Sequence, residues 1–251
     1  MYPTDPDQES ISLAGRQHWD SDAQRYQEAH ANYLADFHWC PERVREADVH
    51  LLGDVRGARV LEVGCGTAPC SQWVANQGAQ LAVGVDISRE MLRGAESGPV
   101  LAQADCLHLP FADSSFDIAF SVFGGLPFVR DVDAALQEIH RVIGPDAPFV
   151  FSVNHPMRWV FPDDPGPHGL VASLSYFDRE YIERDADGAI TYAEFHRTFA
   201  DWIAVLTRTG FRVEKVIEPE WPDGLEENFG QWSPLRGRIF PGSIIWSTRT
   251  F

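Results

Sequence analysis

Positive charge is scarce in this 251-residue chain, and so are long apolar runs. There are 20 Lys and Arg residues against 37 Asp and Glu, which gives a formal net charge of −17 at pH 7. A surface this acidic repels phosphate backbones, so we expect no nucleic-acid partner. No apolar run is long enough to span a bilayer, so we also expect no membrane insertion.

Paired cysteines and a signal sequence are absent as well. The four cysteines, Cys40, Cys65, Cys70 and Cys106, form no C-x-x-C pair, which argues against a zinc site and a disulfide framework. The first ten residues are polar and acidic, without the basic and apolar regions of a signal peptide. We therefore expect no bound metal and a protein of the reducing cytoplasm.

Apolar and aromatic residues, in contrast, are plentiful. Hydrophobic residues make up 44% of the chain, which contains 8 Trp and 16 Phe. This is enough for a sizeable core, and the length suits one α/β domain with an insertion better than two full domains. We expect residues 1–15 to form a disordered tail and residues 16–251 to form that single domain, with an N-terminal helical cap at 17–52 and a substrate-side insertion at 155–198.

Short apolar strands alternate with helices between residues 59 and 153. Such alternation is typical of a mostly parallel sheet with helices on both of its faces. Two further strands follow later in the chain. The predicted strands are 59–63, 80–85, 100–104, 116–122, 147–153, 211–217 and 243–248, and the clearest amphipathic helix is 131–143.

The segments around this alternating core have other patterns. Pro41 is placed to open a helix that runs to about residue 52. Four prolines keep residues 155–170 from forming a regular element. Residues 181–196 alternate in the manner of a β-hairpin with an Asp-Gly turn, so a hairpin is predicted as an insertion after the fifth strand.

The turn after the first strand has the composition of a ligand site. Gly64 and Gly66 follow the apolar strand that ends at Val63, and glycines let a ligand approach the backbone closely. Open α/β sheets bind ligands at this carboxyl end of their strands. A dinucleotide fingerprint would need a third glycine where this chain has Pro69, and Glu62 would repel a pyrophosphate but attract an ammonium group. These residues argue against NAD(P) and FAD.

Residues 60–70 resemble motif I of the class I S-adenosylmethionine-dependent methyltransferases. They are most similar to the small-molecule type related to the ubiquinone/menaquinone methyltransferases (methyltransferase type 11), with Ala68 in place of the usual third glycine. The resemblance covers about residues 50–155 and implies a Rossmann-like, doubly wound α/β fold with seven mostly parallel strands and an antiparallel last strand. It continues through three further segments, each at a strand end: 84–88, 104–106 and 116–123.

The resemblance also implies S-adenosylmethionine as cofactor and S-adenosylhomocysteine as its product. Asp86 would accept hydrogen bonds from the ribose hydroxyls and Asp105 from the adenine amine, while Met91 would pack either on the adenine or in the core. The predicted cofactor-binding residues are Trp39, Glu62, Gly64, Cys65, Gly66, Asp86, Ile87, Met91, Ala104, Asp105, Cys106, Ser121, Val122 and Phe123.

Three polar residues are candidates for catalysis on the acceptor side. Methyl transfer needs the nucleophile aligned with the methyl carbon, and a hydroxyl or carbon acid usually needs a general base as well. His155 follows the fifth strand, and Glu194 and His196 lie on the hairpin; each has a structural alternative, as a hydrogen-bonded loop histidine or as part of a strand edge next to a helix cap. His38 and Trp39 are placed either to close over the cofactor or to pack within the helical cap.

These patterns together predict an enzyme that methylates a small-molecule O, N or C nucleophile by in-line displacement. We expect it to act as a monomer or a homodimer. Two alternatives are a NAD(P)-dependent oxidoreductase and a non-catalytic S-adenosylmethionine-binding regulatory protein, since a fold alone does not guarantee chemistry.

Overall fold

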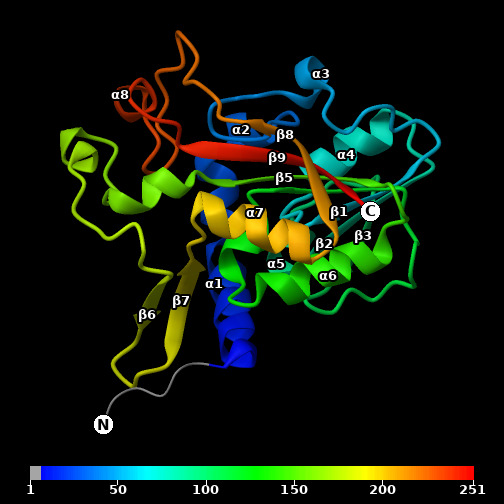
Figure 1. Ribbon diagram of the computed structural model, residues 1–251, viewed down its shortest axis with the longest axis horizontal. Helices are drawn as coiled ribbons and strands as arrows, with labels where there is room; N and C mark the ends of the chain where they lie inside the picture. Colours follow the sequence, from blue (N-terminus) through cyan, green and yellow to red (C-terminus); the bar gives the residue numbers. More distant parts are fainter. Residues whose placement is uncertain (1–6) are drawn as a thin grey trace.

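The computed structural model describes residues 7–251, and its centre is a seven-stranded sheet in the order β3-β2-β1-β4-β5-β9-β8 (Figure 1). The first five strands run parallel, and β9 is antiparallel to both of its neighbours. This confirms the predicted doubly wound α/β fold with an antiparallel last strand. The strands are β1 (Arg59–Val63), β2 (Leu81–Asp86), β3 (Val100–Gln103), β4 (Ile118–Val122), β5 (Pro148–Asn154), β8 (Phe211–Ile217) and β9 (Ser243–Thr250).

Helices cover both faces of this sheet, and each face has its own apolar core. On one face lie α6 (Val132–Val142) and α7 (Phe199–Arg208), and on the other lies α4 (Pro69–Asn76). The side chain of Asp131 caps α6 by accepting a hydrogen bond from the Ala134 N–H, and its apolar residues then face the sheet. The short helix α5 (Arg89–Arg93) follows β2.

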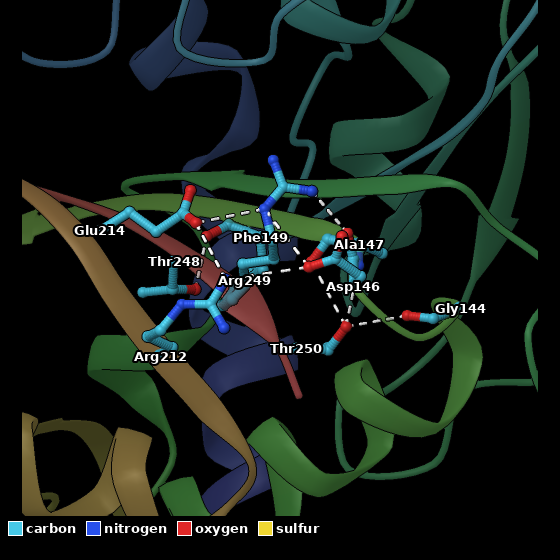
Figure 2. Close-up of polar contacts among 9 residues, drawn as sticks. All are labelled: Gly144, Asp146, Ala147, Phe149, Arg212, Glu214, Thr248, Arg249 and Thr250. Carbon is cyan, nitrogen blue, oxygen red and sulfur yellow. Dashed lines mark hydrogen bonds and ion pairs between the residues drawn. The ribbon is translucent and has the colours of Figure 1, made fainter.

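A polar cluster holds the end of β9 in place. It lies just before the start of β5, away from the carboxyl ends of the parallel strands. The Thr250 hydroxyl donates to the Gly144 carbonyl and accepts from the Ala147 N–H, both at 2.9 Å (Figure 2). Nearby, Arg249 contacts Glu214 of β8 at 3.3 Å. These contacts help to hold β9 between β5 and β8.

The N-terminal helix α1 (Gln8–Ala29) corrects the prediction of a disordered tail at 1–15. Asp7 caps it by accepting from the Ser10 N–H at 2.8 Å, and Ile11 is 1% exposed. Ile11 packs on Ala193 of the hairpin, so residues 8–15 are ordered by a partner that is remote in sequence. Residues 1–6 of the predicted tail lie outside the described residues.

The rest of the predicted helical cap is less helical than expected. α1 is followed by the short helix α2 (Ala31–Leu34). The prediction of a helix from Pro41 to about residue 52 is wrong, since only α3 (Glu46–Val49) forms there. Arg43 has a positive φ of 61°, and the Trp39 N–H bonds to the Val44 carbonyl, which folds this stretch into a turn. Across the chain from residue 7 to 251, no helix is long and apolar enough to cross a membrane.

The predicted hairpin is present as a separate two-stranded sheet of β6 (Glu180–Arg184) and β7 (Ile190–Phe195). Figure 1 shows it alongside α1, with which β7 is in contact. Three short 3₁₀ helices and one short α-helix complete the fold. These are η1 (Leu126–Phe128), η2 (Pro156–Val160), η3 (Pro167–Leu170) and α8 (Pro234–Gly237).

Candidate active site

A cavity of about 1090 Å³, including its open mouth, lies at the carboxyl ends of β1, β2 and β4. The sheet supplies one side of it, through the turns that follow these strands and β3. Helix α1 and the segment after it supply the other side. Of the predicted cofactor-binding residues, the cavity wall contains Glu62, Gly64, Cys65, Gly66, Asp86, Ile87, Met91, Ala104, Asp105, Cys106, Val122 and Phe123.

The turn after β1 packs so tightly that it requires glycine. The N–H groups of Gly64 and Cys65 both donate to the Val85 carbonyl, at 2.8 and 2.9 Å. Gly64 has a φ of 73°, and a Cβ atom there would lie 2.4 Å from the backbone nitrogen of Gly125. Ala68, at the position of the family's third glycine, has a φ of 59° directly before α4. The turn therefore exposes backbone to the cavity.

Glu62 is a buried acid in the wall of the cavity, at 2% exposure. Its Oε2 atom accepts hydrogen bonds from the Ser71 N–H at 2.8 Å and from the Ser71 hydroxyl at 2.6 Å. Burial raises the pKa of Glu62 to about 8, although the bonds from Ser71 oppose this rise. A cationic group that binds beside Glu62 would favour its ionised form.

Asp86 ties together the turns after β1 and β2. Its Oδ2 atom accepts from the Gly66 N–H and its Oδ1 atom from the Ser88 N–H, both at 2.8 Å. Burial raises the pKa of Asp86, and the two backbone bonds oppose that effect. Because each carboxylate oxygen can accept more than one hydrogen bond, Asp86 can still bind ligand hydroxyls. Asp105, after β3, accepts from the Leu107 N–H at 3.0 Å.

These donors and acceptors suit one class of nucleotide better than another. Within residues 7–251, no Lys or Arg lines the cavity, whereas Glu62, Asp86 and Asp105 do. A pyrophosphate would meet three carboxylates and no cation here, so the charges of the site disfavour a dinucleotide. Ribose hydroxyls on Asp86, an adenine amine on Asp105 and an ammonium group near Glu62 fit the same residues, and S-adenosylmethionine carries all three of these groups.

The wall opposite the sheet was not predicted by the motifs. Along the N-terminal segment, Trp19, Tyr26 and Tyr33 reach the cavity, and their seven-residue spacing, which is close to two helical turns, is a signal that could have found them. The His38 Nδ1–H donates to the Tyr33 carbonyl at 2.9 Å, and the Tyr33 hydroxyl donates to the His38 carbonyl at 3.1 Å. His38 thus lies in this wall, and its closing over the cofactor stays a prediction.

Two predicted cofactor-binding residues lie behind the cavity wall instead of in it. Trp39 is fully buried, and its indole N–H donates to Glu46 at 2.8 Å, so it packs within the cap as its alternative predicted. Ser121 is also buried, and its hydroxyl donates to the Val63 carbonyl at 2.7 Å, which links β4 to β1. The prediction that these two side chains contact the cofactor does not fit their positions.

The three predicted catalytic residues meet around a second, smaller cavity, which Pro127 of η1 also lines. His155 accepts from the Met157 N–H through Nδ1 at 3.1 Å and contacts Glu218 through Nε2 at 2.8 Å. Both ring nitrogens are therefore engaged in structural contacts. The structure does not bring His155 to the wall of the larger cavity.

Glu194 and His196 are held in the same way. The Glu194 carboxylate accepts from the Asn154 amide at 2.7 Å. The His196 Nε2–H donates to the Tyr176 carbonyl at 2.9 Å, and its ring stacks on Trp159 with centroids 4.9 Å apart. Burial lowers the pKa of His196 to about 4, so it is neutral at pH 7. β7 ends at Phe195 and Thr198 caps α7, so both residues lie where a strand end meets a helix cap, as their structural alternative has it. A catalytic role for them stays a prediction.

Parts of this sequence are similar to known proteins. Residues 61–151 match a family described as "Methyltransferase domain". The demethylmenaquinone methyltransferase of Thermobifida fusca is 40% identical over 106 residues, which span 39% of this chain and 44% of that protein. The O-methyltransferase rstn1 of Aspergillus nomiae is 27% identical over 75% of this chain and 79% of its own length. The chain thus spans less than half of the first of these relatives.

Solved structures agree in fold. An S-adenosylmethionine-dependent methyltransferase from Mesorhizobium loti has a TM-score of 0.64 and 27% identity, over 81% of this chain and 95% of its own. A 1,6-didemethyltoxoflavin-N1-methyltransferase from Burkholderia thailandensis, solved with S-adenosylhomocysteine, has a TM-score of 0.61 over 100% of this chain and 93% of its own. At 16% identity, the latter shares the fold alone.

The fold is similar to that of a solved S-adenosylmethionine-dependent methyltransferase, and the residues that match the methyltransferase domain include the turns with Glu62, Asp86 and Asp105 in the cavity wall. The domain match and these relatives support an S-adenosylmethionine-dependent methyltransferase, with S-adenosylmethionine as methyl donor and therefore S-adenosylhomocysteine as product. These matches do not favour the two alternatives, a NAD(P)-dependent oxidoreductase and a non-catalytic S-adenosylmethionine-binding protein.

Proposed function

We propose that the enzyme methylates a small-molecule acceptor at an O, N or C nucleophile inside the large cavity. The observation that carries this proposal is the position of α1. Its side chains, among them Ile11, Trp19 and Tyr26, line the same cavity as the turn after β1, so the methyl donor site is enclosed between helix and sheet. An enclosed space suits a small acceptor, and water can be excluded from it.

The residues of this chain bind and orient the reactants. Asp86 holds the ribose, Asp105 the adenine amine and Glu62 the ammonium group, while Val122 and Phe123 form the apolar wall after β4. When bound, S-adenosylmethionine supplies a methyl group that leaves its sulfur as an acceptor lone pair forms the new bond. Alignment of the acceptor with the methyl carbon in a dry cavity then accelerates the transfer.

The names of similar proteins support a small acceptor. They include a demethylmenaquinone methyltransferase and a 1,6-didemethyltoxoflavin-N1-methyltransferase, and both names denote action on small molecules. The acidic composition, with a net charge of −17, argues against nucleic acid as the acceptor. The free cysteines are in keeping with our further proposal of a cytoplasmic enzyme, which acts as a monomer or homodimer.

Calorimetric titration with S-adenosylhomocysteine and with NADH tests the donor site. We expect the wild-type protein to bind S-adenosylhomocysteine and not NADH. The Asp86→Ala variant should bind it at least about tenfold more weakly, because it loses the acceptor of the ribose hydroxyls and two backbone contacts.

The matched control is Asp113→Ala, which removes an exposed carboxylate that is ion-paired with Arg141 and does not line the cavity. It should bind S-adenosylhomocysteine as the wild type does. Circular dichroism of each variant checks that the fold is retained. Wild-type affinity in Asp86→Ala would refute the ribose role, and NADH binding would refute the donor assignment.

A further inference from the structure

A further cavity lies at the carboxyl end of β5, and two arginines form part of its wall. Its volume is about 210 Å³, including its open mouth, and its wall includes Arg158, Gln231, Trp232, Arg236 and Gly242. Because β9 starts opposite the end of β5, Gly242 lies at the same end of the parallel strands as the donor turns. A space of this size suits one functional group of a ligand better than a whole cofactor. We call it the arginine cavity.

An aromatic contact joins the arginine cavity to the donor cavity. Trp232 lines the arginine cavity, and Phe123 lines the donor cavity. The two rings meet edge to face, with their centroids 5.9 Å apart and an interplanar angle of 81°. A group bound in the arginine cavity would therefore lie close to the space that holds the methyl donor.

Arg236 is a buried cation whose side-chain hydrogen bonds go to neutral groups. The residue is 3% exposed, and its Nη1 atom donates to the carbonyl groups of Pro162, Asp164 and Gln231 at 3.0–3.2 Å. Throughout residues 7–251, no carboxylate forms an ion pair with it. Burial lowers the pKa of Arg236, and the charge of the second arginine acts in the same direction, although two nearby aspartates oppose it. A buried guanidinium without an ion-pair partner is costly, so the cavity favours a bound anion.

The polar groups of the wall that remain unused are hydrogen-bond donors. Within residues 7–251, the side-chain hydrogen bonds of Arg236 all come from Nη1, so Nε and Nη2 are left for a ligand. The buried indole N–H of Trp232 has no hydrogen-bond partner in the same range of residues. Gln231 accepts from Arg158 Nε at 2.7 Å through its Oε1 atom, which leaves its amide N–H groups as further donors.

Acidic side chains lie behind the wall of the arginine cavity, and none of those that the structure describes forms part of it. Arg158 pairs with Asp163 at 2.7 Å and with Glu194 at 3.8 Å, so these carboxylates balance that arginine. Glu42 accepts from the Gly242 N–H at 3.2 Å. Burial raises the pKa of Glu42, which favours its neutral form and weakens its repulsion of a bound anion. The acids around the cavity therefore leave part of its positive charge for a ligand.

We propose that the arginine cavity binds the carboxylate group of a small molecule, beside the methyl donor. A carboxylate only accepts hydrogen bonds, so it matches the free donors of Arg236, Trp232 and Gln231. The guanidinium of Arg236 balances the single charge of a carboxylate, but not the charge of about −2 on a phosphate group. This site is distinct from the donor site, and binding to it does not depend on the proposed methyl transfer.

Nuclear magnetic resonance of the Trp232 indole tests the proposal, because this N–H would contact the carboxylate. The protein contains isotope-labelled tryptophan and is saturated with S-adenosylhomocysteine, and the signal that is lost in Trp232→Phe identifies the Trp232 indole. At constant ionic strength, acetate should shift this signal with a Kd of about 1–10 mM. Acetamide, which is uncharged but has the same shape, and inorganic phosphate should both bind at least about tenfold more weakly. No saturable shift with acetate up to about 100 mM, or equal or tighter binding of acetamide or phosphate, would overturn the proposal.

Variants of the cavity wall locate the bound acetate. Gln231→Glu keeps an oxygen that accepts from Arg158, but it adds a carboxylate that repels acetate, so it should abolish the shift. Arg236→Gln should weaken acetate binding at least about tenfold, and Arg236→Lys should retain more of the affinity, because it keeps the charge. Arg238→Gln is the matched control, since Arg238 is exposed and does not line the cavity. Wild-type acetate affinity in both Gln231→Glu and Arg236→Gln would show that acetate binds elsewhere.

The affinity for S-adenosylhomocysteine is measured in parallel, so failures of the two sites are distinguished. If the wild type binds S-adenosylhomocysteine but acetate does not shift the Trp232 signal, the arginine cavity is not a carboxylate site. If the wild type does not bind S-adenosylhomocysteine, the donor site fails, and the acetate titration of the free protein still decides whether the arginine cavity binds a carboxylate.

Discussion

At the scale of single residues, the donor site contains a carboxyl group that the apo protein keeps partly protonated. Burial raises the pKa of Glu62 to about 8, from an ordinary value of 4.5. An acid whose folded pKa lies above its unfolded pKa contributes stability that is complete below about pH 4.5 and is lost as pH rises through about 8. The ammonium group of the methyl donor then favours the ionised form.

This predicts a pH dependence of stability that Glu62→Gln removes. Between pH 5 and pH 9 the free energy of unfolding of the apo wild type should fall more than that of Glu62→Gln, by an amount on the order of a few kcal/mol, since one pKa unit corresponds to about 1.4 kcal/mol. Urea denaturation at several pH values measures the difference. Parallel pH profiles for the two proteins would contradict the raised pKa.

Single residues also show which parts of the site could be predicted from the sequence. Gly64, Asp86 and Asp105 could be placed at the cavity because each lies at the end of a strand or directly after it, and the carboxyl ends of parallel strands meet on one side of the sheet. His155 also follows a strand, yet its ring is engaged by Met157 and Glu218 beside the smaller cavity. Position along a strand predicts the edge of the sheet, but not the direction of a side chain.

At the scale of elements, α1 is the least predictable part of the site and the part that encloses it. Its beginning depends on Ile11 packing against the hairpin, and that contact joins segments about 180 residues apart. The polar sequence before Gln17 has no apolar pattern that would predict the start of α1. The strands of the main sheet, by contrast, are short apolar runs, so their positions could be predicted within a few residues.

Asp20 is the residue that fastens α1 over the donor cavity. Its Oδ1 atom accepts from the Ser88 hydroxyl at 2.7 Å and from the Glu90 N–H at 3.1 Å, at the start of α5. Asp20→Ala should loosen α1 and raise the dissociation rate of S-adenosylhomocysteine about three- to tenfold, because two hydrogen bonds that hold the helix are lost. Stopped-flow tryptophan fluorescence measures this rate.

A substitution on the exposed side of the same helix provides the control. Gln24 bonds only to Glu28 on the surface, so Gln24→Ala should leave the dissociation rate unchanged. An unaltered rate in Asp20→Ala would show that α1 does not limit release of the ligand.

At the scale of the whole molecule, the two ends of the parallel strands differ in what lies against them. The polar contacts around Thr250 and Arg249 fasten the antiparallel strand at one edge (Figure 2). The turns that hold Asp86 and Asp105 lie at the other, under α1. The alternation of strands and helices was enough to predict this architecture, whereas the cap could not be predicted, because its order comes from long-range packing.

The central claim is that the carboxylate-lined cavity holds the methyl donor. A crystal structure of the protein grown with S-adenosylhomocysteine tests it most directly. We predict that the ribose hydroxyls lie within hydrogen-bond distance of Asp86 and the adenine amine within that distance of Asp105. Electron density for the ligand at any other site, with this cavity empty, would contradict the account.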